Sequence, residues 1–380
     1  MAWDIPQPYT VSHPAPLVWA GWWRLFSSLT LLCVAIGCGL WFWLKEPRLL
    51  LVTFGAVIIV ALLFIGIAGW RLFSYGVNAE HAEGIAAQND WHRAEWQAWA
   101  QSGLDVLDYS VIFPVDVPHP VEERVEVNGE QAFALGEYPP INYLFEELLA
   151  PLVASLTALR SPVTVYLPHH GDEATQTAFL VAWEKLGLPA SRITGYISGA
   201  MAVPFAEQVT HWLNEPDGHA KLMMFTQWAE NDANRQATDG AVAWLIAPGM
   251  ETGPYRCRLH RPMTGLLDTI EQDAMQFLTY QPIALNTADL WFNASALTAK
   301  DRLVVERCQR LRAQDPAANP GSPTQQFIPH WLGKPGPATE WFTITLMMMM
   351  AEHHRAPQGL VLAQENALLL ATVSAGVSTS

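Results

Sequence analysis

The sequence has few basic residues and few cysteines for its length. Its 380 residues contain 21 Lys and Arg against 36 Asp and Glu, which gives a formal net charge of −15. So acidic a surface repels nucleic-acid phosphates and anionic lipid headgroups, which excludes both as binding partners. Of the four cysteines, Cys33 and Cys38 lie in a hydrophobic run, while Cys257 and Cys308 can pair or stay free. One bridge is no disulfide framework, and this favours the cytoplasm for the soluble part.

The common short motifs of catalytic and nucleotide-binding sites are also missing. The chain contains no GxSxG, GxxxxGK[ST], GxGxxG or HExxH motif and no CxxC pair. Ser198 stands beside a glycine in "YISGAM", but this is half of a nucleophile elbow and indicates a turn. The sequence therefore predicts a protein that is not an enzyme and has no cofactor and no resident metal.

Two long hydrophobic runs are present near the start. Leu25 to Leu44 has twenty residues without a charge, and Leu49 to Trp70 has twenty-two more. A helix needs about 20 apolar residues to cross the hydrocarbon core of a bilayer. Several tryptophans lie near the ends of these runs, as aromatic residues do at membrane interfaces. We predict a transmembrane helical hairpin in residues 1–71; the alternative is a pair of core helices of a soluble protein.

After the hairpin, the residue pattern predicts a connecting helix over 72–102 and a soluble α/β domain over 103–380. "LDVLDYSVIFPVDV" has the pattern of a first strand, and Asn128-Gly129 indicates a β-hairpin. From residue 141 onward, stretches typical of helices and strands alternate, which favours a layered sandwich with mostly parallel pairing in a mixed sheet. Residues 315–337 are rich in proline and are interpreted as a surface connection. Met347 to Met350 point around a helix, so we expect core packing rather than a copper site.

One stretch has the residues of a site. His169, His170, Asp172 and Glu173 follow the predicted strand "PVTVYLP", and ligands bind at strand ends in open α/β sheets. Adjacent histidines on an extended chain point in different directions, and the sequence shows no third ligand near them. Asp172 can instead cap the next helix. We therefore expect a solvated loop, and the alternative is a catalytic or metal site formed by these four residues.

Several stretches carry a family resemblance. The anchor hairpin, "WQAWAQSGLDVLDYSVIFPVDV", "PVTVYLPHHGDEATQTAFLVAWEKLGLP" and "DGAVAWLIAPG" resemble the bacterial type VI secretion lipase-adapter family over nearly the full chain. The resemblance implies a non-enzymatic, membrane-anchored adapter or chaperone that binds a phospholipase effector and helps to load it onto the secretion spike protein. The alternating elements and the terminal two-stranded hairpin are also similar to a degenerate thiolase-like fold, although a nucleophilic cysteine in a small-residue elbow is missing.

Two functions follow as expectations. The first is the adapter, located in the bacterial inner membrane with its soluble domain in the cytoplasm. Basic residues on the two sides of the hairpin are balanced, so a periplasmic location of that domain is the alternative. The alternative is a membrane-bound hydrolase or metal-dependent enzyme that uses the loop of His169, His170 and Asp172.

Overall fold

The computed structural model describes residues 3–114, 128–135, 141–168, 173–198, 203–228, 235–249, 254–317 and 320–376. The chain divides into two compact units. The globular unit consists of Met1–Ile5 and Trp96–Ser380, and the hairpin unit consists of Pro6–Glu95. The predicted connecting helix is continuous with the second hydrophobic span, and its last residues belong to the globular unit.

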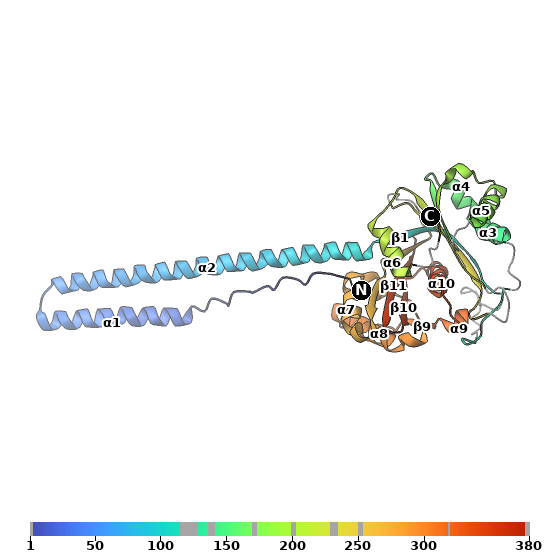
Figure 1. Ribbon diagram of the computed structural model, residues 1–380. Coiled ribbons are helices and arrows are strands. Elements are labelled where there is room, and N and C mark those ends of the chain that lie inside the picture. The colour runs from blue at the N-terminus through green and yellow to red at the C-terminus, as the bar shows by residue number, and fades with distance from the viewer. Residues whose placement is uncertain are drawn as a thin grey trace. The chain divides into compact units, whose positions relative to one another are not determined.

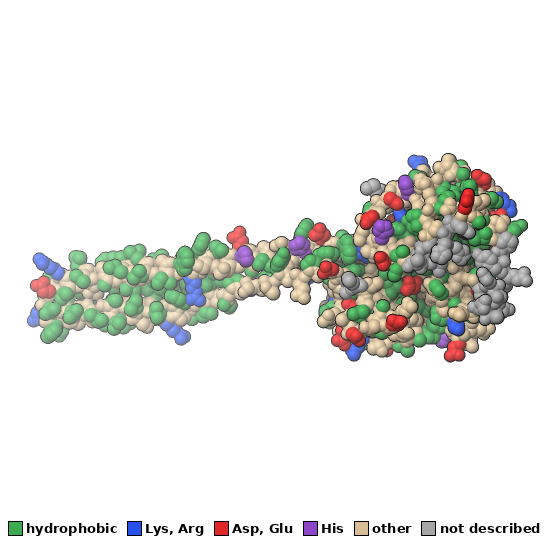
Figure 2. All heavy atoms as spheres, viewed as in Figure 1, with side chains coloured by type: hydrophobic (Ala, Val, Ile, Leu, Met, Phe, Trp, Pro, Cys, Tyr) green, Lys and Arg blue, Asp and Glu red, His purple; other side chains and the backbone are tan. Residues whose placement is uncertain are grey.

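The hairpin unit contains helix α1 (Ala20–Leu44) and most of helix α2 (Arg48–Gln101), which include the predicted spans. Lys45 ends α1 in the left-handed conformation, with φ of 55°. Gly37 allows the two helices to approach closely, because a Cβ there would meet the side chain of Thr53. Both helices are long and apolar enough to cross a membrane. In the apolar 18-residue stretch of each helix, 6% of α1 and 0% of α2 is buried inside the protein. Figure 2 shows apolar side chains along this unit.

The first half of the globular unit contains five strands and their helices. The strands are β1 (Gly103–Ile112), β2 (Val163–Leu167), β3 (Ile193–Ser198), β4 (Ala220–Gln227) and β5 (Gly240–Ile246). The helices are α3 (Ile141–Leu149), α4 (Val153–Ala158), α5 (Glu173–Lys185) and α6 (Phe205–Asn214). Pro151 lies between α3 and α4 in a 3-10 turn, because proline cannot donate the hydrogen bond that a continuous helix needs.

The second half repeats this plan. Its strands are β6 (Cys257–His260), β7 (Met263–Leu266), β8 (Asp289–Phe292), β9 (Thr324–Phe327), β10 (Gln358–Gln364) and β11 (Ala367–Ala375). Its helices are α7 (Ile270–Tyr280), α8 (Leu297–Gln314), α9 (Pro329–Leu332) and α10 (Thr339–His354). Glu365, with φ of 54°, makes the tight turn between β10 and β11.

Strand order shows the duplication. The first half has the order β3-β2-β4-β5-β1, and the second half has the corresponding order β9-β8-β10-β11-β6. In each half the first three strands in this order are parallel to one another. The fourth strand pairs antiparallel with both the third and the fifth. Antiparallel pairing of β1 with β6 joins the two halves into one mixed sheet, and β7 pairs with β11.

Three apolar cores fill the spaces between sheet and helices. One core lies between α3, α4, α5 and the outer face of the first half, and a second lies between α7, α8 and the outer face of the second half. The third core joins the inner faces of both halves to α6 and α10. Figure 1 shows α10 and α6 between the two outer groups of helices. Because α10 is covered on all sides, its residues from Trp341 to Ala351 are buried, including the methionine run, as predicted.

The structure confirms a layered α/β domain with a mixed sheet, and it corrects three details. Pairing is not mostly parallel, because six of the ten paired sets of strands are antiparallel. Ser198, interpreted as part of a turn, is instead the last residue of edge strand β3. The proline-rich connection contains β9 and α9, with Trp331 buried. At the predicted β-hairpin, Asn128 accepts the turn bond from Gln131, but residues 131–135 form no strand, and residues 121–127 lie outside the described part.

Candidate functional site

The two faces of the central strands differ in chemistry. Along β6, Cys257 and Leu259 point to the inner core, so Arg258 and His260 point to the outer face. Asp105 of β1 lies opposite Arg258, and so does Ser374 of β11. The outer face of β1, β6 and β11 therefore carries a line of polar side chains where the two halves meet. We call these four residues, Asp105, Arg258, His260 and Ser374, the polar seam.

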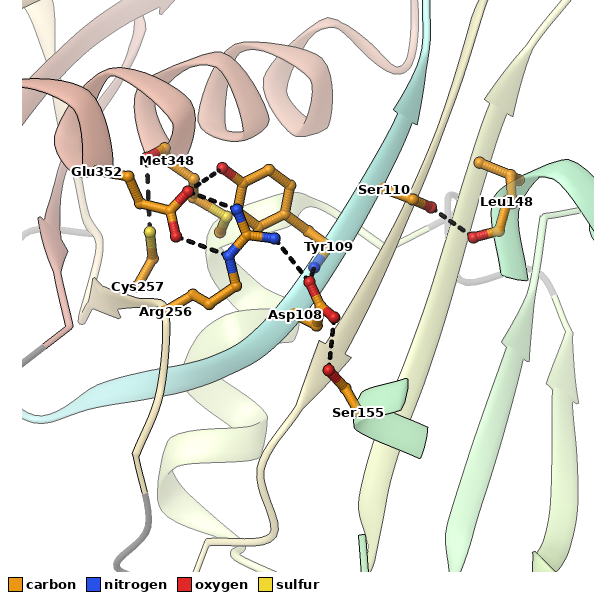
Figure 3. Close-up of polar contacts among 9 residues, drawn as sticks. All are labelled: Asp108, Tyr109, Ser110, Leu148, Ser155, Arg256, Cys257, Met348 and Glu352. Carbon is orange, nitrogen blue, oxygen red and sulfur yellow. Dashed lines mark hydrogen bonds and ion pairs between the residues drawn. The ribbon is translucent and has the colours of Figure 1, made fainter. Parts of the chain in front are cut away.

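Beside the polar seam, a network of charged groups joins β1 to the end of α10 (Figure 3). Arg256 donates two hydrogen bonds to Glu352, at 2.7 and 2.6 Å, and a third to Asp108 at 2.7 Å. The Tyr109 hydroxyl donates to Glu352 at 2.7 Å, and Ser155 of α4 donates to Asp108 at 2.5 Å. We call these five residues the clamp. Every charged group in the clamp is paired with an opposite charge or accepts a hydrogen bond. The clamp is therefore suited to holding β1, α4 and the end of α10 together.

Ionisation in the clamp follows its geometry. Burial raises the pKa of Tyr109, and the hydrogen bond to Glu352 raises it further, so the phenol stays protonated. Burial by itself lowers the pKa of Arg256, but its bonds to Glu352 and Asp108 outweigh burial and raise it. Burial also raises the pKa of Cys257, whose thiol donates to the Met348 carbonyl at 3.5 Å. A thiol that stays protonated is a poor nucleophile, so Cys257 is a packing residue.

The polar seam contains a hydrogen-bonded histidine and serine. His260 is 5% exposed, and its Nε2 lies 2.9 Å from the Ser374 hydroxyl oxygen. Its Nδ1 lies 3.0 Å from the carbonyl oxygen of Gln101, the last residue of α2. A carbonyl can only accept, so Nδ1 carries the proton and Nε2 accepts from Ser374. Ser374 is half-buried, whereas His260 is buried.

The surroundings of His260 favour its neutral form. Burial lowers the pKa of His260, and the nearby Arg258 charge lowers it further, while the bond to Gln101 and the charge of Asp105 oppose the shift. Gly103 lies directly opposite His260 on β1. A Cβ at Gly103 would stand 2.7 Å from the Leu259 carbonyl oxygen, so glycine allows the two strands to approach this closely.

Arg258 supplies positive charge beside the serine. Its Nε and Nη2 donate to the Asp105 carboxylate at 2.6 and 2.9 Å. These bonds raise the pKa of Arg258 against the effect of burial, so the guanidinium is charged. Directly opposite residues in an antiparallel pair have Cβ atoms about 5 Å apart. The Arg258 guanidinium is therefore paired with Asp105 on the β1 side of β6, while Ser374 lies opposite Arg258 on the β11 side.

The residues singled out from the sequence do not form this site. His169, His170 and Asp172 lie outside the described residues, so the alternative site that uses them stays a prediction. Glu173 lies in the first turn of α5, and within the described residues no group of three potential metal ligands occurs. Cys257 and Cys308 are both free.

Sequence reasoning missed His260 and Ser374. They stand 114 residues apart and only the pairing of β6 with β11 brings them together. A local signal was present in "CRLH", whose alternation of apolar and polar residues marks a strand with His260 on the polar face.

No protein-family model matches the chain, and no curated protein matches it. Solved structures do. A tetronic acid condensing enzyme, AbyA1, has a TM-score of 0.40 and 12% identity over 71% of this chain and 99% of its own. The 3-oxoacyl-(acyl carrier protein) synthase III FabH of Xanthomonas oryzae has a TM-score of 0.40 and 10% identity over 72% and 99%. OleA of Xanthomonas campestris, bound with cerulenin, has a TM-score of 0.41 and 10% identity over 73% and 98%.

These comparisons bear on three expectations. The globular unit has a layered α/β fold with a large mixed sheet, as the sequence indicated. The expectation of a non-enzymatic adapter is wrong, because the similar solved structures are condensing enzymes. None of the matches tests the resemblance to the secretion-adapter family or the phospholipase and spike partners, which stay predictions. The neighbours share too little with this chain to assign a reaction, which must come from its own residues.

Replacement of Arg256 tests the clamp. Arg256→Met leaves two partly buried carboxylates, Asp108 and Glu352, without their cation, so we expect unfolding to become easier by about 1–3 kcal/mol. Arg302→Met is the matched control, because it removes an ion pair with Glu271 in which both partners are exposed; it should cost no more than about 0.5 kcal/mol. Chemical unfolding of the full chain in detergent measures both. Equal losses in the two variants would contradict the clamp.

Proposed function

We propose that this chain is a membrane-anchored serine enzyme that hydrolyses or transfers acyl groups. The observation that carries the proposal is the contact of Ser374 with His260, whose other ring nitrogen is fixed by the carbonyl of Gln101. The nucleophile is thus in hydrogen-bond reach of the base, and the base is in reach of its orienting acceptor. This is the geometry of nucleophilic catalysis.

The chemistry follows from the two bonds. His260 Nε2 takes the proton of the Ser374 hydroxyl while Oγ attacks the carbonyl carbon of an acyl ester or thioester. When the tetrahedral intermediate collapses, His260 returns its proton to the leaving alcohol or thiol, and the acyl group remains on Ser374. Water or a second acceptor then removes the acyl group, with His260 again as the base.

The thiol groups of the chain do not offer an equivalent route. The neighbouring solved structures include enzymes named for condensation, but Cys257 is fully buried. Cys308 is half-buried on α8, and Cys33 and Cys38 lie in α1. The Ser374–His260 contact, at 2.9 Å, is also shorter than the 3.4 Å contacts that the hydroxyls of Thr164 and Thr194 make with His219 Nδ1.

We further propose that the hairpin unit anchors the enzyme in the bacterial inner membrane, with the globular unit in the cytoplasm. The support is the exposed apolar surface of α1 and α2, with Phe42 80% exposed and Leu51 79% exposed. An apolar surface of this extent is unstable in water and stable in hydrocarbon. The free state of Cys257 and Cys308 fits a reducing compartment.

Substitution of the serine tests the catalytic proposal. A fluorophosphonate should label Ser374 in the full chain, and Ser374→Ala should abolish labelling and lower cleavage of an activated ester by about 100-fold or more. Ser110→Ala is the matched control, because that hydroxyl also lies on a central strand but donates to a backbone carbonyl, that of Leu148. Labelling that persists in Ser374→Ala would refute the proposal.

The pH dependence supplies an independent check. Catalysis needs neutral His260, and a lowered pKa keeps the imidazole neutral at more acidic pH than a free histidine, whose pKa is about 6.5. The labelling rate should therefore be constant from pH 8 down to about 6.5 and fall only below it. His260→Gln should remove this acid limb along with most of the rate. A midpoint above pH 7 would contradict the assignment of His260 as the base.

Membrane attachment and the side of the membrane on which the globular unit lies can be tested together. Washing membranes with high salt or alkaline carbonate should leave the chain in the pellet, because hydrocarbon rather than charge holds it. In a chain that carries Cys33→Ser and Cys38→Ser, half-buried Cys308 is the accessible thiol, while Cys257 is buried. A membrane-impermeant maleimide should label Cys308 only after lysis. Release by either wash would refute the anchor, and labelling of intact cells would place the globular unit in the periplasm.

A further inference from the structure

The last turn of α2 is held by side chains from the second half of the globular unit. The final carbonyls of a helix have no partner within the helix and need acceptable donors elsewhere. The hydroxyl of Ser102 donates locally to Trp99 O at 2.6 Å, and further donors come from three residues that lie far along the chain. The contacts are Arg261 Nε to Trp99 O at 3.2 Å, Gln281 Nε2 to Ala100 O at 2.8 Å, and His260 Nδ1 to Gln101 O at 3.0 Å.

Arg261 contributes charge as well as hydrogen bonds. Burial lowers its pKa to about 10, so it remains a cation at neutral pH. Its guanidinium lies 4.1 Å from the ring centroid of Trp99 and donates to Asn214 of α6 at 2.9 Å. A cation near the C-terminal end of a helix is stabilised by the partial negative charge there. Arg261 therefore favours one placement of the α2 end.

Gln281 completes the arrangement from the end of α7. It is fully buried, and its Nε2 donates both to Ala100 O and to the Arg261 carbonyl, at 2.8 and 3.1 Å. One side-chain amide thus joins the last turn of α2 to the residue that follows His260. A change at Gln281 alters the distance between the Gln101 carbonyl and the imidazole without touching either group.

Trp3, in the N-terminal segment of the globular unit, packs at the same place. Its ring lies 5.8 Å from those of Trp99 and Phe277, and its Nε1 donates to Pro262 O at 3.1 Å. Gln276 donates to the Trp3 carbonyl at 2.8 Å. The residues before α1 and the end of α2 therefore pack against the same segment of the globular unit.

We propose that Gln281, Arg261 and Trp3 are positioning residues for the Ser374–His260 pair: they fix the last turn of α2, whose Gln101 carbonyl holds the imidazole in the tautomer that can accept the serine proton. The inference rests on the proposed function and deepens it, because it makes the end of the anchor helix part of the catalytic arrangement. A shift of that turn removes the orienting acceptor and lets the imidazole proton move to Nε2, where it blocks the base.

The experiment uses the full chain in detergent and two matched substitutions. Gln281→Met keeps the size of the side chain but removes the donors to α2. Gln358→Met makes the same change at another fully buried glutamine, which accepts from Trp291 Nε1 at 3.1 Å and is not part of the polar seam. The readouts are the rate at which a fluorophosphonate labels Ser374 and the ¹⁵N spectrum of the His260 ring, assigned with His260→Gln.

Gln281→Met should lower the labelling rate by about tenfold or more, since small errors in the placement of catalytic groups are costly, whereas Gln358→Met should change it by less than about threefold. The ¹⁵N spectrum should show the proton on Nδ1 in the unaltered chain and a mixture of tautomers in Gln281→Met. An unchanged rate and tautomer in folded Gln281→Met would overturn the inference.

A second variant decides the question if Gln281→Met does not fold. Trp3→Phe removes the donor to Pro262 and makes the ring that packs against Trp99 and Phe277 smaller, so it should shift the tautomer in the same direction and lower the rate by about threefold. If Gln281→Met does not fold, an unaltered tautomer in Trp3→Phe overturns the inference. If Ser374 is not labelled in the unaltered chain, the proposed function fails, and the ¹⁵N spectra still decide whether these residues position His260.

Discussion

The pairing of β1 with β6 is the contact on which the globular unit depends. It is a short ladder from Gly103 opposite His260 to Val106 opposite Cys257, and it joins two halves that each have their own strand order. On the inner face it brings apolar side chains of both halves against α10. On the outer face it places Asp105 beside Arg258. The same ladder therefore supports the shared core and the polar seam.

The polarity of the seam follows from its position in the layers. The outer helices α3 to α5 cover one half and α7 to α8 cover the other, so the strands between them are only partly covered on that face. Charged groups there must be paired or reach water. Arg258 and Arg256 pair with carboxylates, while Arg261 contacts the carbonyl and the ring of Trp99. The duplicated fold thus produces a polar line at its centre without interrupting the apolar cores.

Sequence reasoning located the elements whose pattern is locally strong. The strands β4 and β5 are continuous apolar runs because both of their faces are buried, and α10 was evident from its length and hydrophobicity. Edge strands were missed. β3 contains Gly195 and ends in Ser198, and β9 reads "TQQF", because a strand with one free edge and an exposed face needs little apolar area. Without these two strands the repeated order of the halves could not be seen.

The site escaped the sequence for a different reason. Ser374 and His260 meet only because β11 lies next to β6, an adjacency set by the duplication rather than by any spacing in the chain. The His169 loop has the pattern of a site in the sequence because its polar residues are consecutive. Consecutive side chains on an extended chain point in different directions, whereas side chains on neighbouring strands can face each other.

A main-chain carbonyl as the orienting group has a chemical consequence. A carboxylate next to a catalytic histidine both fixes its tautomer and stabilises the imidazolium that forms during the reaction. The Gln101 carbonyl fixes the tautomer but carries no full charge, and burial and Arg258 disfavour the imidazolium further. His260 is consequently a weak base, and the barrier is lowest for substrates that need little proton transfer before attack. Thioesters and activated esters meet this condition because their leaving groups depart without full protonation, which makes them the acyl donors best matched to the Ser374–His260 pair.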